Sequence, residues 1–197
     1  MKRIITIILF TMFALTYCVT EKYPLNGIWT GYIEGHNEEI KVSMTFADEF
    51  CFIRYEVGTE TSIVETSIER IKYSYESNPG SLTFPFNRVV QFVIEGNTLS
   101  FTHDGTFVIL NKDTSSKAAP AAIRGVWRDR EDWVLAFVND TAYITRDNTT
   151  DYGAFTFDKQ EGSLNSRVYD AVIEFSINGK VLDTRINGSR HVFSRVE

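Results

Sequence analysis

Hydrophobic and polar residues alternate along most of the chain in short runs. Residues 40–46 read Ile-Lys-Val-Ser-Met-Thr-Phe, so every second side chain is apolar. A period of two is typical of a β-strand that buries one face. In the first half of the chain, comparable runs predict strands at residues 28–33, 50–57, 81–86, 89–95, 99–103 and 106–110.

The second half of the chain repeats this pattern. Strands are predicted at residues 133–138, 141–145, 154–157, 167–169, 171–177, 181–185 and 190–194. Turn signals such as Asp104-Gly105, Asn178-Gly179 and Asn187-Gly188 separate neighbouring runs in both halves. These dipeptides favour tight hairpins because they tolerate positive φ. The pattern therefore predicts successive antiparallel strands joined by short turns.

Residues 61–77 fit two periods. Val64, Ile68 and Ile71 fall at helical spacing, whereas Ile71, Tyr73 and Tyr75 fall at strand spacing. Because β-branched and aromatic residues dominate the segment, the composition favours strands. Further on, Pro85 lies within the predicted strand at 81–86 and indicates an edge strand or a bulge there.

A short phrase occurs twice and opens both halves. It reads Gly-Ile-Trp at residues 27–29 and Gly-Val-Trp at residues 125–127, an offset of 98. Nearer the end of each half the offset is constant at 83, in the pairs Phe92/Phe175, Gly96/Gly179, Leu99/Leu182 and Gly105/Gly188. Matching core and turn positions at one offset indicate a duplication. The first copy then holds 15 additional residues (98 minus 83), which we expect within residues 61–79.

The predicted fold is all-β and consists of two tandem, small, antiparallel up-and-down β-barrels of about eight strands each. The first copy covers residues 25–113 and the second covers residues 123–197. Residues 114–122 are small and polar and include Pro120, a composition typical of a linker.

The first 18 residues have the pattern of a signal peptide. Lys2 and Arg3 precede an apolar stretch at residues 4–17, which is short for a membrane span. The sequence Leu-Thr-Tyr-Cys at 15–18 resembles a bacterial lipobox and departs from it at Tyr17. The resemblance implies acylation of Cys18 and an exported protein anchored in the cell envelope at the outer membrane. Cleavage near residues 18–20 without acylation, giving a periplasmic or secreted protein, is the alternative.

Each copy also resembles the lipocalin-like β-barrels of bacterial secreted proteins and lipoproteins. The resemblance is carried by the Gly-x-Trp start, the late glycine hairpins and a basic residue at the end of the last run. It implies that Trp29 closes one barrel end beneath Lys112, and that Trp127 closes the other beneath Arg195. An eight-stranded barrel can be filled by its own side chains or can hold one small ligand. Short strands and many aromatic residues favour filled barrels.

Charge and chemistry narrow the function classes. The net charge of −6 and the pI near 5.2 argue against a nucleic-acid partner. We predict no catalytic site, no metal site and no cofactor, because the three histidines (His36, His103, His191) and the carboxylates Glu65, Glu69 and Glu76 form no recognisable set. The mixed charge run at 128–132 is expected to be a solvated loop, followed by a core residue, Trp133.

The predicted function is therefore binding without chemistry. We expect a non-enzymatic cell-envelope protein that binds a small hydrophobic ligand or a protein partner through its barrels, with membrane attachment through Cys18. The alternative is a structural, accessory or inhibitory subunit of a surface complex such as that of a secreted protease.

Overall fold

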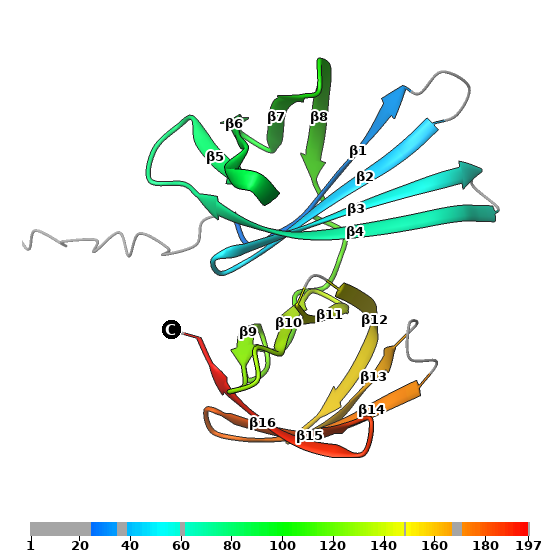
Figure 1. Cartoon of the computed structure of the whole chain (residues 1–197), viewed down its shortest axis with the longest axis vertical. Helices are drawn as coiled ribbons and strands as arrows, with labels where there is room; N and C mark the ends of the chain where they lie inside the picture. Colours follow the sequence, from blue (N-terminus) through cyan, green and yellow to red (C-terminus); the bar gives the residue numbers. More distant parts are fainter. Residues whose placement is uncertain (1–24, 35–38, 60–61, 148, 167–170, 197) are drawn as a thin grey trace, which may run out of the picture.

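The computed structural model describes residues 25–34, 39–59, 62–147, 149–166 and 171–196. It consists of two closed antiparallel barrels of eight strands each, stacked one upon the other (Figure 1). This confirms the predicted all-β class and the two tandem eight-stranded barrels. In both barrels the strands follow one another in chain order, and the first strand pairs with the last to close the sheet.

Barrel 1 is built from the first copy. Its strands are β1 (Gly27–Glu34), β2 (Glu39–Ala47), β3 (Phe50–Thr59), β4 (Ser62–Ser74), β5 (Gly80–Thr83), β6 (Val89–Glu95), β7 (Thr98–His103) and β8 (Thr106–Lys112). The ambiguous segment is a strand, β4, as its composition favoured. Pro85 lies at neither an edge strand nor a bulge but in a single 3₁₀ turn, η1 (Pro85–Asn87), between β5 and β6.

Barrel 2 is built from the second copy. Its strands are β9 (Gly125–Arg128), β10 (Val134–Val138), β11 (Thr141–Arg146), β12 (Thr149–Asp158), β13 (Glu161–Ser166), β14 (Ala171–Asn178), β15 (Val181–Ile186) and β16 (Ser189–Arg195). The sequence pattern did not predict β13, because Leu164 is its only large apolar residue. The strand predicted at 167–169 lies outside the described residues.

Glycine explains how β13 can belong to the barrel. Gly162 pairs with Phe175 on β14, and a Cβ atom at Gly162 would lie 2.4 Å from the Phe175 ring. In barrel 1, a Cβ atom at Gly80 would lie 2.3 Å from the ring of its partner Phe92. In each barrel a large inward ring fills the space left by a missing side chain, so the strand needs little hydrophobicity of its own.

The additional residues of the first copy lie in two hairpins. Met44 and Leu135 pair with the two motif tryptophans and are 91 apart, so seven of the additional residues lie in the β1–β2 hairpin (98 minus 91). Tyr73 and Phe155 occupy equivalent positions and are 82 apart, which places nine more in the β3–β4 hairpin (91 minus 82). Between these positions and the pair Phe92/Phe175 the offset rises from 82 to 83, so the second copy holds one additional residue there. The second group falls between residues 55 and 67 (146 minus 91, and 149 minus 82). The prediction that all of the additional residues lie within residues 61–79 was therefore wrong for the first group and only partly right for the second. Strands β1 to β4 extend well beyond the barrel body (Figure 1).

The two barrels pack through equivalent outer faces. The outer side of β2 and β3 contacts the outer side of β9 to β12, and the buried apolar residues of this interface are Ala47, Phe50, Phe52, Val126, Val134, Ala136, Val138, Tyr143 and Tyr152. At its centre Phe52 stacks on Tyr143, with ring centroids 4.4 Å apart. These two residues are equivalent at the 91-residue offset. Contact between equivalent positions is the property of a two-fold symmetric interface, so the barrels are related by a pseudo-two-fold axis.

Polar contacts fix this arrangement. The hydroxyl groups of Thr45 and Tyr143 are 2.8 Å apart in a buried hydrogen bond, and the amide of Val126 donates to the Asp48 carboxylate at 2.7 Å. Burial raises the pKa of the Tyr143 hydroxyl. At the rim, Arg128 forms an ion pair with Glu49. The interface is therefore both apolar at its centre and specifically paired around it.

Candidate functional site

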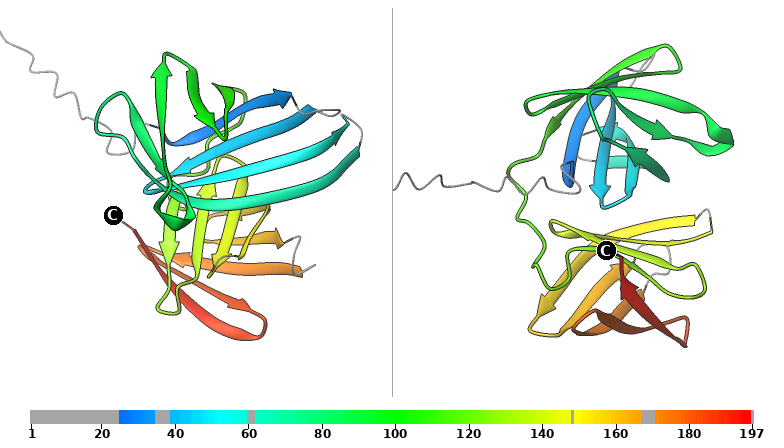
Figure 2. Two further views of the ribbon diagram at one scale, coloured as in Figure 1. Left: turned by 45° about the horizontal axis from the view of Figure 1, so that its top comes forward. Right: turned by 90° about the vertical axis from the view of Figure 1, so that its left-hand side faces the viewer.

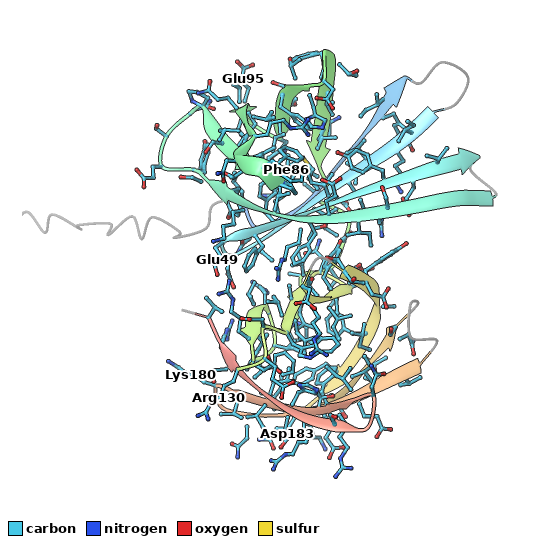
Figure 3. The ribbon with its side chains drawn as sticks, in the orientation of Figure 1. Glu49, Phe86, Glu95, Arg130, Lys180 and Asp183 are labelled. Carbon is cyan, nitrogen blue, oxygen red and sulfur yellow. The ribbon has the colours of Figure 1, made fainter. Side chains whose placement is uncertain are left out.

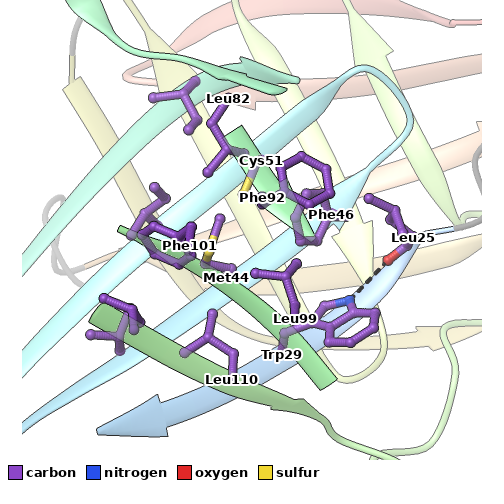
Figure 4. Close-up of a cluster of buried hydrophobic side chains, with 14 of the residues drawn as sticks. Leu25, Trp29, Met44, Phe46, Cys51, Leu82, Phe92, Leu99, Phe101 and Leu110 are labelled. Atoms are coloured by element: carbon purple, nitrogen blue, oxygen red, sulfur yellow. Dashed lines mark hydrogen bonds between the residues drawn. The ribbon is translucent and has the colours of Figure 1, made fainter. Parts of the chain in front are cut away.

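The two motif tryptophans occupy matching sites at one end of each barrel. Trp29 is 2% exposed, and its indole N–H donates to the carbonyl of Leu25 at 3.2 Å (Figure 4). Trp127 is fully buried and donates to the carbonyl of Ile123 at 2.8 Å. In both cases the acceptor lies four residues earlier, a contact that the sequence pattern did not indicate.

A basic side chain lies over each indole. The Lys112 ammonium is 5.4 Å from the Trp29 ring, and the Arg195 guanidinium is 5.8 Å from the Trp127 ring. Arg195 also donates to the carbonyls of Ala121 and Arg124. Lys112 is positioned by its backbone amide, which donates to the backbone carbonyl of Asn97 at 2.8 Å. The cation in barrel 2 thus has more partners than the cation in barrel 1.

Core side chains occupy the interiors of both barrels. In barrel 1 the inward rings of Phe46, Tyr73 and Phe92 meet in edge and tilted contacts. In barrel 2 Phe137 is the centre of a similar cluster with Phe155 and Phe175. Because these rings come from strands on several sides, each barrel is a packed core rather than a hollow cup.

The far end of barrel 2 is closed by a second tryptophan, Trp133. It is 2% exposed and lies between the ring of His191 and the guanidinium of Arg146, at 5.5 and 5.1 Å. His191 Nδ1 is 2.7 Å from a carboxylate oxygen of Asp129. The other Asp129 oxygen accepts the amides of Glu131 and Trp133 at 2.8 and 2.9 Å. These contacts clamp the loop that follows β9.

This clamp changes the interpretation of the charge run. Residues 130–132 are exposed and Trp133 is buried, as expected for a solvated loop followed by a core residue. The expectation was wrong for Asp129, whose side chain is 4% exposed, and for Arg128, which pairs with barrel 1. Potential ligand atoms of Asp129, Glu131 and His191 lie within 4.8 Å of one another. Since both Asp129 oxygens already accept hydrogen bonds, we interpret this group as the loop clamp.

The outer surface of barrel 1 carries an exposed apolar face. It consists of five residues on strands β1, β6 and β8, namely Tyr32, Val89, Val93, Phe107 and Ile109. Phe107 and Tyr32 are 62% and 61% exposed. The small residues of β7 lie between them, because Ser100 pairs with both Val93 and Ile109, and Thr102 pairs with Phe107. We call this surface the apolar face.

The outer surface of barrel 2 carries a groove of about 790 Å³ across β12 to β15. Four carboxylates line it, together with a single cation, Arg185; the carboxylates are Asp158, Glu161, Glu174 and Asp183. Asp183 accepts three hydrogen bonds from the Arg190 guanidinium, two from Nε at 3.0 and 3.1 Å and one from Nη2. This contact lowers the pKa of Asp183. We call this surface the charged groove. Figure 3 shows Asp183 at the end of the molecule far from barrel 1.

The apolar face and the charged groove use overlapping, equivalent strands. At the 83-residue offset, Gln91, Ser100, Thr102 and Phe107 of barrel 1 correspond to Glu174, Asp183, Arg185 and Arg190 of barrel 2. Only Val89 and Ile109 keep an exposed apolar counterpart, in Val172 and Val192. The same outer face of one repeated unit is uncharged in the first copy and charged in the second. Neither face was predicted from the sequence, although the offset contains the information.

The remaining predicted residues are dispersed. Cys18 and His36 lie outside the described residues. His103 stacks on Phe84 at 4.7 Å and contacts Arg88, far along the chain from His191. The side chains of Glu69 and Glu76 are exposed, and that of Glu65 lies outside the description. The structure therefore does not bring the sequence-predicted candidates together into one site.

Comparisons with known proteins give no family. No family profile and no curated protein matches the chain. Solved structures that align with it include a Helicobacter pylori β clamp bound to a DNA ligase peptide, with 6% identity over 87% of this chain and 58% of that one, at a TM-score of 0.17. A Thermotoga maritima DNA polymerase III β subunit aligns with 9% identity over 89% and 57% of the two chains, at a TM-score of 0.18. The chain thus spans a little over half the length of these structures, and such low scores carry no argument about function.

Within the described ranges, no helix has the length and apolarity that crossing a membrane requires.

Proposed function

We propose that this is an exported, non-enzymatic binding protein of the cell envelope that holds a protein partner on its outer surface. The observation that carries the proposal is the contrast between inside and outside. The interiors of both barrels are packed with side chains, whereas equivalent outer strands have diverged into an apolar face and a charged groove. Exposed surfaces of this kind mark interaction sites.

The envelope location is part of the proposal. It is supported by the resemblance of residues 15–18 to a lipobox and of each barrel to the lipocalin-like barrels of bacterial lipoproteins. Acylated Cys18 would anchor the chain in the outer membrane. Globomycin treatment, followed by mass spectrometry of the mature N-terminus, tests the anchor. An N-terminus without acyl mass overturns it.

The charged groove sets the chemistry of the partner. Its lining has four carboxylates, of which Asp183 is already paired with Arg190, and one cation, Arg185. The excess of negative charge that remains favours a segment rich in lysine or arginine. Several of these charges are exposed, so binding should weaken as salt is raised. A groove of about 790 Å³ has room for a few side chains of such a segment.

Native mass spectrometry of the protein purified from its own envelope tests the partner. We expect a co-purifying protein that is lost when the groove is neutralised in the double variant Asp158→Asn, Glu174→Gln. The matched control is Glu95→Gln, which removes an exposed carboxylate from barrel 1 and should retain the partner. Retention of the partner by the groove variant, or a protein that purifies alone, contradicts the proposal.

A second candidate function is binding of a small hydrophobic ligand at the mouth of barrel 1. The lengthened hairpins leave the inward residues Ile33, Ile40 and Tyr55 only partly buried at that end. Burial and the nearby Glu69 raise the pKa of Tyr55 to about 12, so its hydroxyl remains a hydrogen-bond donor. The same native mass spectra distinguish this function, because they would show a small apolar molecule whose retention depends on Tyr55 and not on the groove.

A further inference from the structure

Strand β4 has a long edge that no other strand covers. It pairs with β3 along residues 62–72, but it pairs with β5 only at Lys72, Tyr73 and Ser74. Among the described residues, the stretch 62–71 therefore has no strand beside it on the side of β5, over about 30 Å. We call this stretch the open edge. Figures 1 and 2 show β4 projecting past β5 beside β3.

The backbone that follows β5 turns away from the open edge. Thr83 is the last residue of β5 and pairs with Lys72. The next amide, that of Phe84, donates to the carbonyl of Arg88 at 2.8 Å and so closes the turn η1. The Arg88 guanidinium in turn donates to the Asp104 carboxylate at 2.9 Å. The turn is thus held against the β7–β8 hairpin, and the gap beside β4 is built into the fold.

Backbone donors of β4 point into this gap. The amide of Tyr73 donates to the carbonyl of Glu49 at 3.4 Å, on the side of β3. Because the backbone groups of an antiparallel strand alternate between its two sides, the amides of Thr66, Ile68 and Arg70 point to the opposite side. A row of unpaired donors and acceptors at a strand edge is a template for one more strand. The chemistry that completes it is an extended polypeptide backbone.

The equivalent edge of barrel 2, on β12, is covered. Strand β13 has six residues where β5 has four, and it continues further along its neighbour. A Cβ atom at Gly153 would overlap the carbonyl oxygen of Asn165, so the two backbones are in contact there. Beyond it, the Ser166 hydroxyl donates to the buried carboxylate of Asp151 at 2.6 Å. The open edge therefore distinguishes the first copy, in which the longer β3–β4 hairpin extends it.

Charges beside the open edge select the strand that can join it. Glu69 pairs with the fully buried Ile53, so it belongs to the inward row of β4, and its side chain is exposed. Glu65 occupies the same row four residues earlier, paired with Val57. Two copies of this chain that met through the open edge would bring these like charges together, which is unfavourable. A strand with lysine or arginine at alternate positions would meet opposite charges instead.

An exposed aromatic ring lies where the open edge begins. Phe86 is fully exposed in the turn η1, where its φ of 62° follows Pro85. It comes three residues after Thr83, the partner of Lys72, and is therefore at most about 11 Å from that pair. Aromatic residues are enriched at the centres of protein interfaces. An apolar side chain of an added strand would find a packing surface on this ring.

We propose that the open edge of β4 accepts an extended, basic segment of a partner protein as an additional antiparallel β-strand. The backbone of that segment bonds to Thr66, Ile68 and Arg70, and its basic side chains meet Glu65 and Glu69. This site lies on barrel 1 and is separate from the charged groove of barrel 2. It therefore goes beyond the function proposed above and does not depend on it.

A designed peptide and amide hydrogen exchange test the added strand. The probe is a fluorescein-labelled peptide, Thr-Val-Thr-Lys-Thr-Val-Thr-Lys-Thr-Val-Thr, which is titrated into the purified full chain and followed by fluorescence anisotropy. Hydrogen exchange measured by NMR then locates the bound peptide. We expect the amides of Thr66, Ile68 and Arg70 to exchange about tenfold more slowly with peptide bound. The amides of Ser67 and Glu69, which face β3, should change much less.

Two N-methylated peptides separate backbone pairing from charge attraction. In an antiparallel pair the threonines of the peptide lie opposite Thr66, Ile68 and Arg70, so their amides face β4. N-methylation of the three central threonines should weaken binding about fivefold for each hydrogen bond lost. N-methylation of the valines and lysines, whose amides face away, is the matched control and should leave the affinity unchanged. Equal weakening by the two peptides contradicts the proposal.

Charge variants of the protein separate this site from the charged groove. Glu69→Lys reverses a charge beside the open edge and should weaken peptide binding about fivefold. Glu76→Lys reverses an exposed carboxylate beyond the end of β4 and should bind as the parent does. The groove variant Asp158→Asn, Glu174→Gln should also bind the peptide as the parent does. Loss of the peptide in the groove variant overturns the added strand, whereas loss of a co-purifying protein there concerns the groove alone.

Three further outcomes overturn the proposal. The first is no binding at about 1 mM peptide. The second is binding that leaves exchange at Thr66, Ile68 and Arg70 unchanged. The third is slow exchange of these amides without peptide that becomes slower as the protein concentration rises, because a second copy of the chain would then cover the open edge.

Discussion

Barrel 1 and barrel 2 agree closely at the ends that Trp29 and Trp127 close, and they differ sharply on their outer surfaces. Both use a tryptophan that donates to a carbonyl four residues earlier, a cation over that ring, and a glycine that leaves room for a phenylalanine. On the outer strands the agreement disappears, and Ser100, Thr102 and Phe107 face Asp183, Arg185 and Arg190 at equivalent positions.

The difference shows which constraints shape each surface. Interior residues must fill a closed volume at high packing density, so a change at one position requires changes at its neighbours. Outward residues that contact only solvent can change independently of their neighbours. They are therefore free to become specialised for binding. The interface between the barrels, formed by β2–β3 and β9–β12, consists of outward residues that are buried because the barrels pack together. It is therefore tightly packed as well.

The largest expected loss of stability comes from replacing either of the two barrel-closing tryptophans. Trp127→Ala removes a fully buried indole and should lower the free energy of unfolding by about 3–5 kcal/mol. The same change at Trp29 should cost a similar amount if the two sites are truly equivalent. Urea denaturation followed by far-ultraviolet circular dichroism measures both. An unchanged melting curve for Trp127→Ala contradicts the closing role.

The two packing glycines sharpen the comparison. A Cβ atom at Gly162 would meet the Phe175 ring and also the backbone oxygen of Thr156, both at 2.4 Å. At Gly80 the nearest atoms all belong to the Phe92 ring, which can move. We expect Gly162→Ala to cost about 1–3 kcal/mol and Gly80→Ala to cost less. Denaturation midpoints of the two variants check the order, and a costlier Gly80→Ala would refute it.

The contact between the barrels should give a smaller effect. Tyr143→Phe removes the buried hydrogen bond to Thr45 and should cost about 1 kcal/mol. Because the folded pKa of Tyr143 is raised by burial, its contribution is fully present below the unfolded pKa near 10 and is lost as pH rises through the folded value. Stability above pH 10 should therefore fall more steeply in the parent than in Tyr143→Phe. The exposed Tyr32→Phe is the control and should follow the parent.

The smallest effect concerns the cations over the tryptophans. Arg195→Ala removes a ring contact and two backbone hydrogen bonds, whereas Lys112→Ala removes a ring contact alone. We expect losses of about 1 and about 0.5 kcal/mol, in that order. Thermal unfolding of the two variants measures the difference. Equal losses would mean that the carbonyl contacts of Arg195 add nothing.

The sequence predicted the architecture because alternation and duplication are local or periodic signals. The strands, the hairpin glycines and the two halves all follow from residue patterns such as residues 40–46 and the pair Gly105/Gly188. Strand β13 was missed because its inward position at Gly162 is filled by a ring from β14. Its burial depends on a partner that the local pattern does not contain.

The candidate sites were less predictable for a related reason. The apolar face depends on which strands remain uncovered, and that follows only after the packing of the two barrels is known. Phe52 and Tyr143 look like ordinary strand residues in the sequence, yet one covers the other at the pseudo-two-fold axis. The role of Asp129 was hidden in the same way, because its partner His191 lies 62 residues away.

The stacking of Phe52 on Tyr143 has a consequence for how the chain can be divided. A contact between equivalent positions can form between two separate polypeptides as well as within one chain. The linker residues Lys117 and Ala118 are exposed, so trypsin could cut there without disturbing either barrel. The two fragments would then remain together as a split protein, and barrel 2 produced alone would pair with a second barrel 2 through its uncovered face.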